Sequence, residues 1–258
     1  MKNDLALVLI EKNGQKINHS WQYYEKRAGR AAGALRHLGI GRGDFVVVAA
    51  PNTPDSFFVL LGIIAVGAVP IPVSIFMLKE PGQKELRYIL GDCKPKLILT
   101  SSLLSIYLKD IDHITFEGLF LRGSYLKEPA EIKINELFKT DPNSLFIMPY
   151  TSGTTGASKG VMLSAGNILD RVRAAIKEFE LTQKDRVFSY MPLGHIAELI
   201  ATFFGQLVAK YTVYFSEYSK DILEDQEAFR AAFPNILREV RPTAFLAVPK
   251  VWSNIRKE

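Results

Sequence analysis

The sequence predicts an α/β fold in which mostly parallel sheets are flanked by helices. Short runs rich in Val, Ile and Leu alternate with segments of helical periodicity along most of the 258 residues. This alternation is typical of parallel strands covered by helices. Hydrophobic residues make up 48% of the chain and charged residues 23%, a balance that allows a sizeable buried core.

The first half of the chain predicts helices that alternate with buried strands. A helix is expected to begin after Ser20 and to end at Gly39, and residues 45–50 follow as a strand. Residues 84–90 and 97–100 repeat the pattern as a helix and a strand. The apolar face of the first helix consists of five residues at helical spacing: Tyr24, Ala28, Ala31, Leu35 and Leu38.

Residues 56–78 carry no charge and are long enough to span a bilayer. Thr53-Pro54 is the pattern of an N-cap followed by proline at the first helical position, and Gly67 is a C-terminal stop. Prolines at positions 70 and 72 follow this stop. The segment is therefore predicted to form a buried helix and a buried strand, with a transmembrane helix as the alternative.

The second half predicts strands at residues 145–150, 160–163 and 211–215. Ser164 is expected to cap a helix, and residues 196–208 mark one apolar face of a further helix. Residues 107–143 are the least periodic part, with a weak strand at 114–121, and are predicted to contain a subdomain boundary. The helix after Ser164 has this apolar face: Ile168, Val172, Ile176 and Phe179.

Charge and cysteine content exclude some classes of protein. The 32 Lys and Arg against 27 Asp and Glu give a net charge of +5, but the basic residues are scattered, so no nucleic-acid partner is expected. Cys93 is the only cysteine and cannot form an internal disulfide, so the cysteine content does not indicate an oxidising compartment. We interpret Cys93 as a structural residue. Glu11 ends a short apolar stretch at residues 5–10, which is too short for a secretory signal. A cytoplasmic location is expected.

The stretch from Thr151 to Gly160 has the composition of a phosphate-binding loop. Glycines let backbone N–H groups approach an anion, hydroxyls add hydrogen-bond donors and a lysine adds positive charge. An ordinary solvated turn is the alternative, since glycine, serine and threonine are common turn residues. A P-loop NTPase would need Ser or Thr after the lysine, whereas Gly160 follows here. The stretch contains Thr151, Ser152, Gly153, Thr154, Thr155, Gly156, Ala157, Ser158, Lys159 and Gly160.

Residues 150–160 resemble the signature loop of the adenylate-forming superfamily of acyl-CoA synthetases, luciferases and peptide-synthetase adenylation domains. Residues 39–44 with Pro51-Asn52, residues 65–73 and residues 191–195 resemble other motifs of that superfamily. The resemblance implies part of an acetyl-CoA synthetase-like fold. Residues 1–258 would then be a truncated N-terminal AMP-binding domain, since a helical pattern after Pro249 is cut at Glu258 without a C-cap.

The same resemblance implies ATP, Mg²⁺ and coenzyme A as cofactors or co-substrates. ATP would contact Thr151, Ser152, Gly153, Thr154, Thr155, Gly156 and Lys159. Thr151 would also be a metal ligand, and His195 and Lys159 would be the catalytic residues. Ser158 departs from the superfamily, which usually has proline there, and predicts a more mobile turn.

Two side chains leave alternatives open. His195 either lies beside the acyl pocket, as the resemblance implies, or caps the helix that follows it. Glu198 either faces the same site or is a solvated helix residue. Composition does not define an acyl tunnel, and Phe203, Phe204 and Tyr211 are interpreted as ordinary core.

Residues 192–198, 241–243 and 248–252 resemble the long-chain fatty acyl branch, which implies a long-chain fatty acid–CoA ligase with a fatty acid substrate. The alternatives are a catalytically incompetent nucleotide- or lipid-binding domain, another adenylate-forming ligase and a structural module at a membrane. Little synthetase activity is expected from the isolated chain. Peripheral membrane contact and a homodimer through the truncated edge are further expectations.

Overall fold

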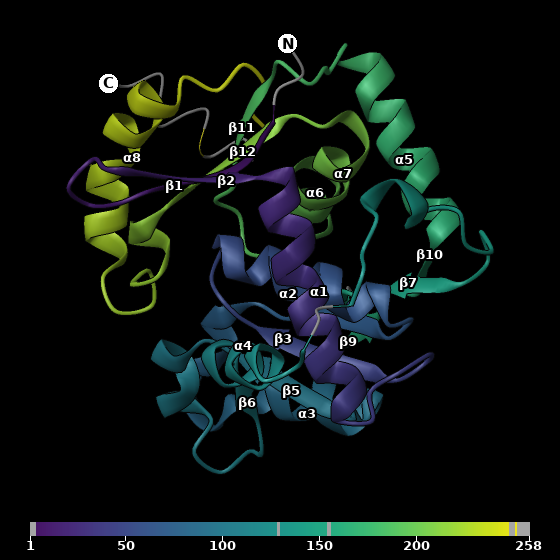
Figure 1. The fold of residues 1–258 in the computed structure, drawn as a ribbon. Helices are drawn as coiled ribbons and strands as arrows, with labels where there is room; N and C mark the ends of the chain where they lie inside the picture. The colour runs from purple at the N-terminus through teal and green to yellow at the C-terminus, as the bar shows by residue number, and fades with distance from the viewer. Residues whose placement is uncertain (1–3, 128–129, 154–155, 248–250, 252–258) are drawn as a thin grey trace.

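The computed structural model describes residues 4–127, 130–153, 156–247 and 251. Its larger sheets each have four strands (Figure 1). One has the order β4-β3-β5-β6, and every neighbouring pair in it is parallel. Its strands are β3 (Phe45–Ala49), β4 (Val69–Pro72), β5 (Leu97–Thr100) and β6 (Ile114–Thr115).

The other sheet has the order β11-β12-β1-β2. Strand β12 pairs in parallel with both β11 and β1, and β2 is antiparallel to β1. The predicted mostly parallel α/β architecture is thereby confirmed. The strands are β1 (Leu5–Ile10), β2 (Lys16–Ser20), β11 (Arg186–Phe188) and β12 (Thr212–Ser216).

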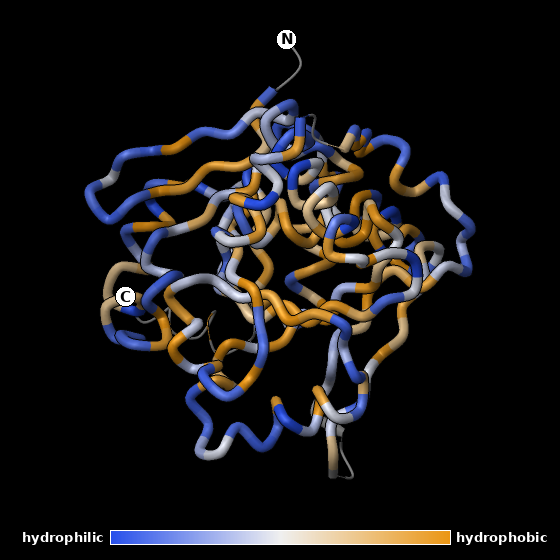
Figure 2. The backbone as a smooth tube through the Cα atoms, turned by 60° about the horizontal axis from the view of Figure 1, so that its bottom comes forward, coloured by the Kyte–Doolittle hydropathy of each residue, from blue (hydrophilic) through white to orange (hydrophobic). Residues whose placement is uncertain are grey.

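Helices α1 (Trp21–His37) and α2 (Pro54–Ala65) lie between the two sheets (Figure 1). They pack closely, because a side chain at Gly62 would place its Cβ 2.8 Å from the Cβ of Ala31. One hydrophobic core joins them to Leu7 of β1 and Val46 of β3. Figure 2 shows the hydrophobic segments concentrated in the middle of the molecule and the hydrophilic ones mainly in outer loops.

The remaining elements cover the sheets or connect the strands. The α-helices are α3 (Lys84–Cys93), α4 (Phe116–Ser124), α5 (Ala165–Glu178), α6 (Ile196–Glu198), α7 (Gly205–Ala209) and α8 (Gln226–Val240). The 3₁₀ helices are η1 (Ile75–Leu78), η2 (Pro81–Gln83), η3 (Ser102–Tyr107), η4 (Ile134–Glu136) and η6 (Glu217–Ser219), and η5 (Leu199–Phe204) is a π-helix. Two strand pairs complete the fold: β7 (Leu145–Ile147) with β10 (Leu163–Ser164), and β8 (Tyr150–Gly153) with β9 (Gly156–Gly160).

The predicted helix caps are confirmed. The side chains of Ser20, Thr53 and Ser164 accept hydrogen bonds from backbone N–H groups in the first turns of α1, α2 and α5. Gly67 follows α2 with φ of 78°, a left-handed conformation that glycine adopts without steric cost. Residues 54–72 therefore form a helix and a strand. Among the described residues, the structure contains no helix with the length and apolar content needed to cross a bilayer.

Three expectations about secondary structure and burial are wrong. Residues 114–121 form only a two-residue strand before α4 begins, because Thr115 caps that helix and Phe116, Leu119 and Phe120 are buried at helical spacing. Residues 160–163 form no continuous strand, since β9 ends at Gly160 and β10 begins at Leu163. Phe179 follows the end of α5 and is 70% exposed, so it does not belong to the buried face. The boundary within residues 107–143 remains a prediction.

Candidate active site

The glycine-rich stretch is a β-hairpin and not an open loop after a single strand. Strands β8 and β9 are antiparallel, with Gly153 opposite Gly156. The backbone of Ser152 lies within β8. Thr154 and Thr155 lie outside the described residues. Two short antiparallel strands thus contain the backbone of the three glycines, Thr151 and Ser158 that the sequence singled out.

Thr151 and Lys159 lie directly opposite each other in this hairpin. Directly opposed residues of an antiparallel pair project from the same face. Both side chains are exposed, whereas neighbouring Ser158 is buried on the other face. Within the described part of the chain, no carboxylate forms an ion pair with Lys159. One hydroxyl and one uncompensated positive charge therefore share an open face that can receive an anion.

The base of the hairpin is fixed to helix α3. The Tyr150 hydroxyl donates a hydrogen bond of 2.5 Å to Oδ2 of Asp92. Burial is the main cause that raises the pKa of Tyr150 above its ordinary value, and it raises the pKa of Cys93 to about 11. Gly160 allows close packing here, because a Cβ would lie 3.1 Å from the Tyr150 ring. The buried, protonated thiol of Cys93 supports its structural interpretation.

His195 caps helix α6 and also lines a cavity. Its Nδ1 accepts a hydrogen bond of 3.2 Å from the backbone N–H of Ala197. The side chain is exposed and borders a cavity of about 390 Å³ that Asn52 and Met191 also line. Both readings of His195 are therefore compatible with its position. In the described part of the chain, Thr151 and Lys159 do not line this cavity.

Glu198 is buried, with 1% exposure, so its interpretation as a solvated residue is wrong. Its Oε1 accepts hydrogen bonds from Ser189 Oγ at 2.5 Å, Thr202 Oγ1 at 2.9 Å and Asn52 Nδ2 at 3.0 Å. Burial raises the pKa of Glu198 to about 7, although these donors oppose the shift. Sequence reasoning missed Ser189 and Thr202. One indication of this cluster was present in the sequence, which was that Glu198 follows the motif residue His195 by three positions.

Helices α6 and α7, with the π-helix η5 between them, border a second and larger cavity. This cavity has a volume of about 1080 Å³ and lies against α5. The Tyr211 hydroxyl donates to the carbonyl of Ala201, inside the π-helix, where Gly205 leaves room for it. Phe203 and Phe204 are fully buried core residues. Apolar side chains dominate the lining, which includes Ile168, Val172, Ile176, Ile196, Ile200 and Leu246.

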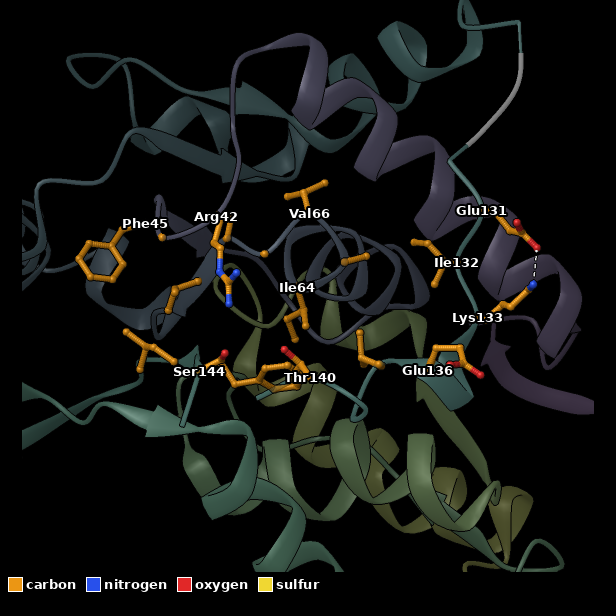
Figure 3. A pocket seen from close by; sticks show the side chains of 18 residues that line it. Arg42, Phe45, Ile64, Val66, Glu131, Ile132, Lys133, Glu136, Thr140 and Ser144 are labelled. Carbon is orange, nitrogen blue, oxygen red and sulfur yellow. Dashed lines mark ion pairs between the residues drawn. The ribbon is translucent and has the colours of Figure 1, made fainter. Parts of the chain in front are cut away.

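A third cavity of about 640 Å³ lies at the opposite ends of β3 and β4 (Figure 3). Arg42 extends into it, and Glu131 and Lys133 at its rim form an ion pair of 2.9 Å. None of the described site residues predicted from the sequence lines this cavity. It is therefore separate from the candidate site.

The chain is similar to known adenylate-forming proteins. The family described as AMP-binding enzyme matches residues 2–258. The long-chain-fatty-acid–CoA ligase ACSBG1 of Bos taurus is 28% identical over 281 residues, which cover 99% of this chain and 37% of the relative. ACSBG1 of Rattus norvegicus is 30% identical over 264 residues, which cover 91% of this chain and 34% of the relative.

Solved structures show the same fold. The crystal structure of ATP-bound MatB from Rhodopseudomonas palustris matches with a TM-score of 0.74 and 22% sequence identity. The match covers 99% of this chain and 48% of MatB. The chain thus spans about a third of the length of the curated relatives and about half of the solved one.

Proposed function

Because the chain belongs to the AMP-binding enzyme family, we propose that it supplies the phosphate-binding hairpin and the acyl-binding wall of an ATP-dependent long-chain fatty acid–CoA ligase. The observation that carries this proposal is the hairpin of β8 and β9, which places Thr151 opposite Lys159 on one exposed face. The ligase names of the two relatives support the acyl branch. Cytoplasmic location, membrane contact and dimerisation remain predictions.

The hairpin fits the triphosphate of ATP. When a fatty carboxylate attacks the α-phosphorus, the bond to pyrophosphate breaks and negative charge grows on that leaving group. Lys159 and the hydroxyls of the hairpin stabilise this charge. The Thr151 hydroxyl is an oxygen donor of the kind that Mg²⁺ takes together with phosphate oxygens. Bound Mg²⁺ would neutralise phosphate charge at this position.

The cavity of about 1080 Å³ suits an apolar chain, since its lining is mainly aliphatic and aromatic. The acyl chain would lie along α5 and η5, and His195 would stand beside its carboxyl end. No protein base is needed for adenylation, because a fatty acid is already deprotonated near neutral pH. In the second step the coenzyme A thiol attacks the acyl carbonyl and AMP leaves.

Palmitate is expected to bind the purified chain in this cavity. Ala175 of α5 lines it and is only half-buried, so Ala175→Phe fills part of the space and is expected to weaken palmitate binding about tenfold. Isothermal titration calorimetry measures both affinities. Ala65→Phe, in the third cavity, is the matched control and should bind palmitate as the parent chain does. Equal weakening by both variants, or no palmitate binding at all, would contradict the acyl assignment.

Removal of the hairpin lysine is expected to weaken ATP binding. Lys159→Ala deletes a charged hydrogen-bond donor. The dissociation constant of MgATP is therefore expected to rise about tenfold. Calorimetric titration with MgATP measures this change. Lys139→Ala removes an exposed lysine that pairs with Glu136 outside the hairpin and serves as the control. If the two variants bind MgATP with the same affinity, the hairpin is not the phosphate site.

A further inference from the structure

The Glu198 carboxylate joins the two sheets at the carboxyl ends of their strands. Asn52 follows β3 of one sheet, and Ser189 follows β11 of the other. Both side chains donate to Oε1 of Glu198, as Thr202 of the π-helix does. The backbones of Tyr190 and Met191 also act to lower the pKa of this carboxylate. One buried acceptor therefore joins Asn52, which is 146 residues away in the chain, to Ser189 and Thr202, which are near Glu198 in the sequence.

These contacts fix the orientation of the Asn52 amide. Its Nδ2 lies 2.7 Å from the carbonyl oxygen of Met191, which can only accept a hydrogen bond. The same nitrogen lies 3.0 Å from Oε1 of Glu198 and 2.8 Å from Oγ of Ser189. The nitrogen must therefore face this cluster, and Oδ1 points away from it. In the described part of the chain, no hydrogen bond to Oδ1 is formed, and Asn52 lines the cavity of about 390 Å³ beside His195.

We propose that Glu198 is a positioning residue for the bound acyl-adenylate: its carboxylate holds the Asn52 amide so that Oδ1 accepts a hydrogen bond from the ligand. This inference rests on the proposed function. The ligand side of the bond is a hydroxyl or amino donor of the adenylate. Asn52 makes the contact, and Glu198 acts through Asn52 without touching the ligand.

Protonation of Glu198 would weaken this arrangement. A neutral carboxyl group carries a hydrogen that must be donated, but most of the surrounding groups are themselves donors. Burial raises the pKa of Glu198 to about 7, so the ionised state is reached near neutral pH. The neighbouring titratable groups are Tyr211, whose pKa is raised by burial and also by Glu198, and His195 three residues earlier.

The test measures binding of palmitoyl sulfamoyl adenosine, a stable mimic of palmitoyl-adenylate, to the 258-residue chain between pH 6 and pH 8.5. The affinity of the parent chain is expected to rise about tenfold over this range, because only about a tenth of Glu198 is ionised at pH 6. Glu198→Gln should bind more weakly at pH 8.5 and show no step with pH. Its affinity for Mg-tripolyphosphate, which reports on the hairpin, should stay unchanged.

Thr202→Val is the matched control, because it removes one donor but keeps the carboxylate. It should retain the step and move it to higher pH, since the Thr202 hydrogen bond lowers the pKa of Glu198. A step that persists in Glu198→Gln would belong to a group other than Glu198 and would overturn the inference, as would a parent chain whose affinity does not vary with pH. Absence of any binding to the parent chain would instead refute the proposed function.

Discussion

Replacement of Gly205 with alanine is expected to lower the free energy of unfolding by about 3 kcal/mol. The added Cβ would lie 2.7 Å from the carbonyl oxygen of Ile200 and would also overlap the Tyr211 hydroxyl. Neither group can withdraw easily, because Tyr211 is fully buried and its hydroxyl is bonded to Ala201. Urea denaturation of the parent chain and the variant measures the difference.

Gly91→Ala provides the control for Gly205→Ala. Gly91 lies inside helix α3, and a Cβ there would meet no atom within 4 Å. Alanine should therefore leave stability unchanged or raise it by up to about 1 kcal/mol. On a Tyr211→Phe background, Gly205→Ala should cost less, because one of the two overlaps is gone. An undiminished cost on that background would show that Tyr211 does not restrict position 205.

The stability of the chain is expected to fall as pH rises from 5 to 8, and Glu198 is expected to cause a large part of the fall. Its pKa is about 7 in the folded chain against an ordinary 4.5. Between these values the folded state keeps a proton that the unfolded state has released, so rising pH favours unfolding. The contribution is present in full below pH 4.5 and is lost by pH 7 to 8. It amounts to roughly 2 to 3 kcal/mol between pH 5 and pH 8.

Glu198→Gln isolates this contribution, because glutamine has a similar shape and does not titrate. Urea denaturation at pH 5, 6, 7 and 8 gives the free energy of unfolding for both proteins. Between pH 5 and pH 8, the free energy of unfolding of the variant should rise by roughly 2 to 3 kcal/mol relative to that of the parent chain. The variant also loses hydrogen bonds, but that loss displaces the whole curve and leaves the shift intact. Parallel curves would mean that Glu198 has no raised pKa.

Local sequence signals predicted many of the helices and strands correctly. Ser20, Thr53 and Ser164 are followed by helices because a side-chain oxygen can satisfy an N–H group two or three residues later. Gly67 ends a helix because it adopts positive φ freely. The prediction of a weak strand at residues 114–121 was wrong for a related reason. A cap at Thr115 and apolar residues at helical spacing outweighed two β-branched residues.

The chemistry of the hairpin was also readable from the sequence, but its geometry was not. Three glycines, several hydroxyls and Lys159 indicated an anion site through their composition alone. Strand pairing decided that Thr151 and Lys159 share one face and that Ser158 is buried on the other. Register depends on contacts between strands, and residue types within one stretch do not specify it.

The sequence by itself thus determined the α/β class, the family motifs and the residue types of the candidate phosphate site. Only the tertiary structure decided that Glu198 is buried and that its pKa lies near 7. Asn52 donates to Glu198 and also lines the cavity of about 390 Å³, yet it is 146 residues away from Glu198 in the chain. Burial and desolvation are properties of a folded environment, and distant segments create that environment together.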